Sequence, residues 1–128
     1  MIVGVGVDLV EVPRIAEALA HPRWGARFEA RVFCPGEIAY CRRRRATAQS
    51  FAARFAAKEA VMKALGRGYL GGGIGWRQIE VVRERGRPSV TLSGRARQRA
   101  DEIGIARLHL SLTHTAAFAV AYVVAETE

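Results

Sequence analysis

The alternation of apolar and polar residues predicts a strand over residues 2–10. The face opposite its valines carries two glycines and Asp8. Glycine weakens a strand and often marks the close approach of a ligand or of another backbone. We therefore expect one packed face and one bare face, with Asp8 near the end of the bare one, where it can also cap the next helix. The packed face would comprise Val3, Val5, Val7 and Leu9.

A helical period governs residues 51–66, FAARFAAKEAVMKALG. It predicts a long helix, buried nearly all round, that starts near Thr47 under a Thr47 or Ser50 cap and ends at Gly66. Its core stripe would comprise Phe51, Phe55, Met62 and Leu65. The helix also carries charges for which a buried helix has no structural need: Arg54, Lys58, Glu59 and Lys63.

Glu59 and Lys63 lie one turn apart on a face whose other members are alanines. As an exposed pair they would stabilise the helix by a few tenths of a kcal/mol. Alternatively, a partly buried carboxylate needs a cation and a buried ammonium needs an anion. A metal ion bound together with a phosphate would meet both needs, and the small neighbours would leave room for them.

Shorter patterns complete an α+β chain without repeats. Further helices are expected over residues 12–20, 27–33, 37–45 and 94–102. Strands are expected over residues 76–82 and 89–92, around a turn at 84–88, and on both sides of a polar turn within residues 108–125. In the last segment, Leu108, Leu110 and Leu112 face one way, opposite His109, Ser111 and Thr113. The glycine-rich stretch 66–75 lacks the GK[ST] of a Walker loop, and is either a flexible connection or the wall of a ligand site.

Composition narrows the function classes. The 128 residues fit a single domain, 1–128, and the net charge of +8 favours an acidic protein, a nucleic acid or a polyphosphate as partner. Cys34 and Cys41 match neither redox nor zinc spacing, which is typical of free thiols in a reducing compartment. The sequence has no signal peptide and no membrane span, so a cytoplasmic location is expected.

Asp8 and Glu59 together predict a magnesium site. Mg²⁺ takes one or two protein carboxylates, waters and the oxygens of a substrate phosphate. Lys63 would then meet the phosphate charge that the metal leaves uncompensated. This combination indicates chemistry on a pyrophosphate or phosphodiester, where catalysis depends mostly on positioning and charge stabilisation.

Three segments resemble the holo-acyl-carrier-protein synthase family of 4′-phosphopantetheinyl transferases. They are GVGVDLVEVPRI at 4–15, RFAAKEAVMKALG at 54–66 and LSLTHTAAFAVAYVV at 110–124, in the order and spacing of the family. The resemblance implies Mg²⁺-dependent transfer of 4′-phosphopantetheine from coenzyme A to a serine of apo acyl carrier protein, releasing adenosine 3′,5′-bisphosphate, in support of fatty acid biosynthesis.

The resemblance also implies roles for individual residues. Asp8 and Glu59 match the metal ligands, and Glu59 and Lys63 the catalytic positions. Lys63, Arg54 and His114 match positions that bind coenzyme A, and Arg14 one that meets the acidic helix of the carrier. The base that takes the serine proton is either Glu59 acting through a water or His109. Arg45, in the run Arg42–Arg45, aligns loosely with a segment near the coenzyme A 3′-phosphate.

The family resemblance further implies a fold and an assembly. We expect a short antiparallel sheet packed with a long buried helix, in a homotrimer whose active sites lie between subunits. Ala53 stands where many relatives have glycine, and the stretch 68–75 is longer and richer in glycine than in some members.

Two alternatives come from other classes of protein. A small nucleic-acid-binding module would use the same arginines, but aromatic residues interleaved with them are scarce and no RNA-binding signature is present. A non-catalytic docking domain for carrier proteins would keep the arginines and have no use for Asp8. The resemblance favours the enzyme, with no nucleic acid and no membrane among its partners.

Overall fold

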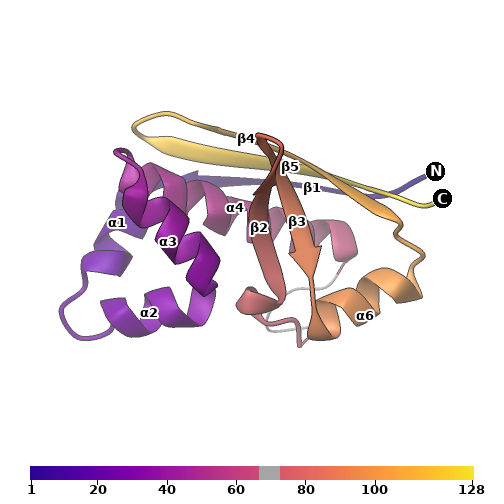
Figure 1. Cartoon of the computed structure of the whole chain (residues 1–128), viewed down its shortest axis with the longest axis horizontal. Helices are drawn as coiled ribbons and strands as arrows, with labels where there is room; N and C mark the ends of the chain where they lie inside the picture. Colours follow the sequence, from indigo (N-terminus) through magenta and orange to yellow (C-terminus); the bar gives the residue numbers. More distant parts are fainter. Residues whose placement is uncertain (67–72) are drawn as a thin grey trace.

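A three-stranded antiparallel sheet and one long helix form the centre of the computed structural model, which describes residues 1–66 and 73–128. The strands β1 (Ile2–Glu11), β5 (Phe118–Glu126) and β4 (Arg107–His114) lie in the order β1, β5, β4. Helix α4 (Thr47–Leu65) runs along one face of this sheet (Figure 1). The predicted combination of a short antiparallel sheet with a long buried helix is therefore confirmed.

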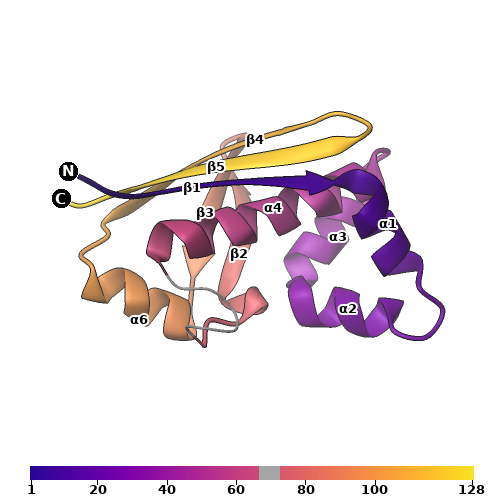
Figure 2. The same cartoon turned by 180° about the vertical axis from the view of Figure 1, so that it is seen from behind.

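Smaller elements flank this centre. In Figure 2 a group of three helices lies under one end of the sheet and a hairpin with a further helix under the other. The helices are α1 (Val12–Ala20), α2 (Gly25–Val32), α3 (Pro35–Arg43) and α6 (Gly94–Glu102). The hairpin pairs β2 (Ile79–Glu84) with β3 (Arg87–Leu92). The strand predicted from residue 76 begins at Ile79 instead, because Trp76–Gln78 form a short 3₁₀ helix.

The two ends of α4 differ in how well the sequence predicted them. Gly66 closes the helix in the left-handed conformation, at φ 71°, as expected. The predicted cap was wrong, because the N-cap residue is Ala46 and neither Thr47 nor Ser50 caps the helix. The Thr47 hydroxyl instead donates to the carbonyl of Arg44 at 2.7 Å.

The packed face of β1 is the opposite of the predicted one. Gly4 and Gly6 lie directly on α4, where an added Cβ would come within 2.2 Å of the Ala64 carbonyl oxygen and 1.9 Å of the Ala60 carbonyl oxygen. Contacts this short leave no space for any side chain, so strand and helix meet backbone to backbone. The alanines of α4 therefore make room for β1 and not for a ligand, which corrects the expectation for Ala60.

The outer face of the sheet carries exposed apolar side chains. The helices of the described residues all lie on the other side of the sheet, as both cartoons show. The valines expected in the core lie on this outer face, where Val7 is 52% exposed and Leu9 62%. Neighbouring β5 adds Tyr122, paired with Val7, and Phe118 to the same face. A patch of this kind on a small protein marks an interaction surface.

Lys58 has a structural role that the sequence did not reveal. Its ammonium lies 2.9 Å from a carboxylate oxygen of Glu37, and both side chains are fully buried. Lys58 also donates to the carbonyls of Trp76 and Ile79. Glu37 in turn accepts the backbone N–H groups of Cys34 and Val81, each at 2.8 Å. This network joins α3, α4 and the start of β2.

Within the part of the chain that the structure describes, none of the helices has the length and apolar character needed to cross a membrane.

Candidate functional site

Asp8 and Lys63 meet where β1 crosses α4. The ammonium of Lys63 lies 3.1 Å from Asp8 Oδ1 and donates to the carbonyl of Val7 at 2.9 Å. Asp8 therefore does not cap the following helix, whose N-cap residue, Glu11, also forms no side-chain cap. The intrahelical pair with Glu59 is not formed either, since Lys63 pairs with Asp8. Asp8 belongs to the segment 4–15 and Lys63 to the segment 54–66, two of the three segments that resemble the transferase family.

Glu59 stands on the one partly exposed stripe of the helix. Between Phe51 and Leu65, every residue is buried except Phe55, Glu59 and Lys63, which follow one another at four-residue intervals. Phe55 thus belongs to this stripe and not to the core stripe that the period predicted. Burial raises the pKa of Glu59 and the nearby charge of Asp8 raises it further, while Lys63 lowers it. The two carboxylates are therefore close enough to repel each other.

Asp8 and Glu59 line the same cleft, of about 480 Å³. Arg14 of α1 also lines it, with its side chain exposed. The rest of the wall is largely apolar and aromatic, and includes Ile15, Ala18, Phe28, Phe55 and Phe118. Glu11 adds a third carboxylate to the lining, so the cleft has three carboxylates and one cation among apolar side chains.

The carboxylate pair fits a hard divalent cation. Two adjacent carboxylates are stabilised by a positive ion, and oxygen is the ligand that Mg²⁺ prefers. Within residues 1–66 and 73–128, no three His, Cys, Asp or Glu side chains lie close enough to hold a metal by themselves. Such a pair suits Mg²⁺, which completes its coordination with waters and substrate phosphates, better than zinc.

His114 lies in a separate, basic pocket of about 340 Å³ at the end of β4. Ser50 of α4 also lines this pocket, and no carboxylate does. Its remaining walls are the arginines Arg43, Arg44 and Arg45, with Ala46. This pocket shares no lining residue with the cleft of Asp8 and Glu59. The sequence-predicted site residues therefore form two groups in one chain.

Arg54 lines neither the cleft nor the basic pocket and is only 4% exposed. Its guanidinium carbon lies 4.1 Å from the centre of the Tyr40 ring, and its Nε has no hydrogen-bond partner. Buried guanidinium nitrogens without an acceptor are unusual in folded proteins.

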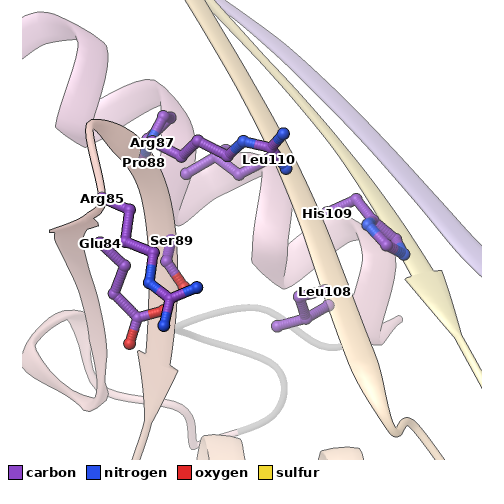
Figure 3. Close-up of a pocket in the computed structure, with 8 residues that line it drawn as sticks. All are labelled: Glu84, Arg85, Arg87, Pro88, Ser89, Leu108, His109 and Leu110. Carbon is purple, nitrogen blue, oxygen red and sulfur yellow. The ribbon is translucent and has the colours of Figure 1, made fainter.

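His109, the alternative base, lies away from the carboxylates. Its Nε2 is 3.0 Å from Glu126 Oε1 on the outer face of the sheet. A pocket of about 880 Å³ lies between the hairpin turn and β4, with His109 in its lining (Figure 3). Leu108 and Leu110 point toward the hairpin, while His109 lies on the other side of the strand, as the predicted alternation requires. In this chain His109 does not line the cleft of Asp8 and Glu59.

Other site features had little or no signal in the sequence. The aromatic residues Phe28 and Phe118 line the cleft but lie in segments where one aromatic residue is unremarkable. The contact between Tyr40 of α3 and Arg54 of α4 depends on how the two helices pack, which their sequences do not show. The predicted ligand wall at 66–75 falls mostly on residues 67–72, outside the described residues.

Known proteins with similar sequences and structures cover the whole chain. Residues 4–123 match the model of the 4′-phosphopantetheinyl transferase superfamily. A holo-[acyl-carrier-protein] synthase of Koribacter versatilis is 50% identical over 98% of this chain and 99% of its own length. A holo-[acyl-carrier-protein] synthase of Anaeromyxobacter sp. is 51% identical over 98% of this chain and 97% of its own length.

Solved structures agree with these sequence relations. The synthase from Neisseria meningitidis has a TM-score of 0.86 and 32% identity, over 99% of this chain and all of that one. The Helicobacter pylori synthase in complex with coenzyme A has a TM-score of 0.80 and 32% identity, over 95% of this chain and 99% of that one. These similarities favour the transferase over the nucleic-acid-binding and docking alternatives.

Proposed function

Because the chain belongs to the holo-[acyl-carrier-protein] synthase family of 4′-phosphopantetheinyl transferases, we propose that it is a Mg²⁺-dependent enzyme of this reaction. It transfers 4′-phosphopantetheine from coenzyme A to a serine of apo acyl carrier protein and releases adenosine 3′,5′-bisphosphate. Its product supports fatty acid biosynthesis. The observation that carries the proposal is the convergence of Asp8, Glu59 and Lys63, from two distant motifs, beside one cleft.

Asp8 and Glu59 are the residues that would hold Mg²⁺. When bound, the ion would neutralise charge on the pyrophosphate and polarise the bond that breaks. Lys63 donates to Asp8 and to the carbonyl of Val7, which leaves one N–H of its ammonium for a phosphate oxygen. Its side chain is 54% exposed, so a substrate can reach it. Because a metal-bound carboxylate has a lowered proton affinity, Glu59 would take the proton of the attacking serine through a water.

The basic pocket provides a second contact for coenzyme A. His114 and Arg45, which line this pocket, are assigned to the contact, and Arg54 is assigned to it from the family resemblance. A pocket lined by arginines without a carboxylate accepts an anion directly.

The carrier protein would dock at the cleft from the side of α1 and α2. Arg14 lies at the cleft, and Arg23, Arg27 and Arg31 add exposed cations to the same pair of helices and the turn between them. Acyl carrier proteins are acidic, so long-range attraction to a chain of charge +8 speeds their encounter and weakens with salt.

We assign a homotrimeric state with active sites between subunits. The uncovered sheet face supports it, since side chains such as Val5, Val7 and Tyr122 are each about half exposed in one chain. The separation of the cleft from the basic pocket also supports it. A cleft of one subunit beside the basic pocket of the next would join the two groups of site residues.

A mass measurement of the carrier tests the proposed function. The protein is incubated with coenzyme A, Mg²⁺ and apo acyl carrier protein, and the carrier should gain the mass of phosphopantetheine. The gain should disappear with a chelator, return on adding Mg²⁺, and be lost in Asp8→Ala and Glu59→Ala. Arg97→Ala, an exposed residue of α6, is the control that should leave the gain unchanged. Unmodified carrier with the wild-type protein, or full transfer by both carboxylate variants, would contradict the proposal.

A further inference from the structure

Lysine occurs at only two positions of the sequence, 58 and 63, and the other eighteen positively charged side chains are arginines. Arginine keeps its charge and does not become a nucleophile in proteins, whereas the amine of lysine is a common target of acylation. Both lysines lie on α4. The sites at which a lysine of this chain can be acylated are therefore confined to one helix, the one that carries Glu59.

The two lysines differ completely in burial. The side chain of Lys58 has no exposed surface, and its ammonium is enclosed by the Glu37 carboxylate and two backbone carbonyls. The side chain of Lys63 is 54% exposed, and its ammonium pairs with Asp8 beside the cleft. A dissolved reagent can therefore reach Lys63 in the folded protein, whereas it reaches Lys58 only after local unfolding.

The thiols of the chain do not compete with Lys63 for an acyl donor. Cys34 and Cys41 are both buried, and burial raises the pKa of the Cys34 thiol and raises that of Cys41 to about 11. Because the thiolate is the reactive form of cysteine, neither side chain is an accessible nucleophile at neutral pH. The amine of Met1 is accessible, but it lies at the end of β1 opposite α1, away from the cleft (Figure 2).

An acyl phosphate is the donor whose chemistry suits this position. The proposed site accommodates a phosphate, because Lys63 has one unused N–H and Asp8 and Glu59 can share a metal ion. In an acyl phosphate the acyl carbon is bonded to a phosphate oxygen, so a donor held by its phosphate has its reactive carbon close to Nζ. In a thioester of coenzyme A, the acyl carbon lies at the far end of the pantetheine arm from the pyrophosphate.

We propose that Lys63 is an acylation site, at which an acyl phosphate converts the ammonium to a neutral amide and so inactivates the enzyme. This inference rests on the proposed function for its effect on activity. The amine attacks the acyl carbon and a C–N bond forms. The C–O bond to phosphate breaks, the leaving phosphate keeps the electron pair, and the surplus proton of the nitrogen passes to water. Acylation removes the positive charge that lies 3.1 Å from Asp8 Oδ1.

Labelling of the full-length protein with acetyl phosphate in Mg²⁺, mapped by mass spectrometry of its peptides, tests the inference. Lys63 should be acetylated about 10²-fold faster than Lys58. Transfer activity should fall in proportion to the label on Lys63, by about 10²-fold when labelling is complete. Succinimidyl acetate, an acyl donor without a phosphate, is the comparison. The ratio of label on Lys63 to label on the Met1 amine should be about 10-fold higher with acetyl phosphate.

Two variants separate acylation of Lys63 from other effects of the reagent. Lys63→Arg keeps a cation that cannot be acylated, so the activity that this variant has should survive acetyl phosphate. Adding Arg97→Lys to that variant places an amine on the exposed surface of α6, where it should take up label without a loss of activity. Circular dichroism of the labelled wild type should match that of the unlabelled protein, which shows that inactivation is not unfolding.

Three results would overturn the inference. They are a Lys63 that stays unlabelled, full activity in protein that is completely labelled at Lys63, and equal ratios of Lys63 to Met1 labelling with the two donors. Failure of transfer with every carrier before any labelling would instead contradict the proposed function. In that case the peptide map would still show whether Lys63 accepts an acyl group from the phosphate donor.

Discussion

Lys63 of α4 pairs with Asp8 of β1 at 3.1 Å, although a helical partner, Glu59, stands one turn away. Strand and helix approach closely enough for this pair because two glycines of β1 rest on the backbone of α4. The pair leaves Glu59 without its expected cation and beside a second carboxylate. The arrangement is unfavourable for a protein without ligands and favourable for one that binds a metal and a phosphate.

Replacing Lys63 should impair catalysis more than folding. We expect Lys63→Met to lower kcat/KM for coenzyme A about 10²-fold, because one cation that contacts the developing phosphate charge is lost. The free energy of unfolding should change by less than about 1 kcal/mol, since this ion pair is partly exposed. Transfer kinetics and urea unfolding measure the two effects. Activity close to that of the wild type would remove Lys63 from the site.

The raised pKa of Glu59 predicts a pH-dependent gain in stability for Glu59→Gln. A carboxyl group whose pKa is higher in the folded than in the unfolded state disfavours folding when it is ionised. This penalty is fully present at pH above the raised folded pKa and disappears as the pH falls below the unfolded value of about 4.5. Without metal, Glu59→Gln should therefore melt at a higher temperature than the wild type at pH 7.5, with the difference vanishing near pH 4.

Added Mg²⁺ should reverse this order at pH 7.5, because only the wild type keeps both carboxylates. Thermal melts with and without Mg²⁺ test the point. A variant that is less stable than the wild type at pH 7.5 without metal would contradict the carboxylate repulsion.

A methyl group at Gly6 should disrupt the site through the backbone. Gly6→Ala places a Cβ 1.9 Å from the Ala60 carbonyl oxygen, so β1 must move away from α4. We expect a loss of at least about 3 kcal/mol of stability, together with loss of transfer activity as Asp8 moves with the strand. Gly75→Ala is the matched control, since the nearest atom to its Cβ would be in the Gln78 side chain, at an ordinary contact distance of 3.6 Å. For the control, urea unfolding should show a change in the free energy of unfolding of less than about 1 kcal/mol.

Replacing each of the two lysines of α4 by methionine should change the free energy of unfolding by very different amounts. Lys58→Met leaves Glu37 buried without its cation, which typically costs about 3–5 kcal/mol. Lys63→Met, five residues further along the same helix, is the surface comparison. Equal urea midpoints for the two variants would contradict a structural role for the buried pair.

Charge on the outer sheet face should prevent assembly. Val7→Asp and Tyr122→Asp place carboxylates in the apolar patch that we assign to subunit contact. Light scattering should give three times the chain mass for the wild type and a smaller value for these variants. Arg97→Asp, on a helix on the other side of the sheet, should remain trimeric. A monomeric wild type that is fully active would contradict the shared active site.

The sequence predicted most of the elements and the carboxylate pair. The helical period and the Gly66 stop located α4, alternation located β1 and β4, and a buried, β-rich run located β5. Asp8 and Glu59 were identified as candidates because glycines and alanines around a charge are unusual. Their side chains do line one cleft, as the sequence analysis expected.

Which face of β1 is buried could not be predicted from its pattern. Alternation separates two faces but does not say which one meets the helix, and a row of valines ordinarily faces the core. Here Gly4 and Gly6 face the backbone of α4, so the valines lie on the opposite, outer face of the sheet. Lys58 was likewise interpreted as a surplus charge, because its partner Glu37 lies 21 residues away on another helix.

The glycine contact between β1 and α4 lets the main chain alone set the spacing of the proposed metal site. Where side chains separate two elements, a new rotamer or a substitution changes the distance between the elements. No side chain separates Gly6 from the Ala60 carbonyl, so nothing there can be exchanged for a shorter or longer spacer. Strand β1 bears Asp8 and helix α4 bears Glu59. Substitutions elsewhere in the core can therefore accumulate without changing the distance between these two elements.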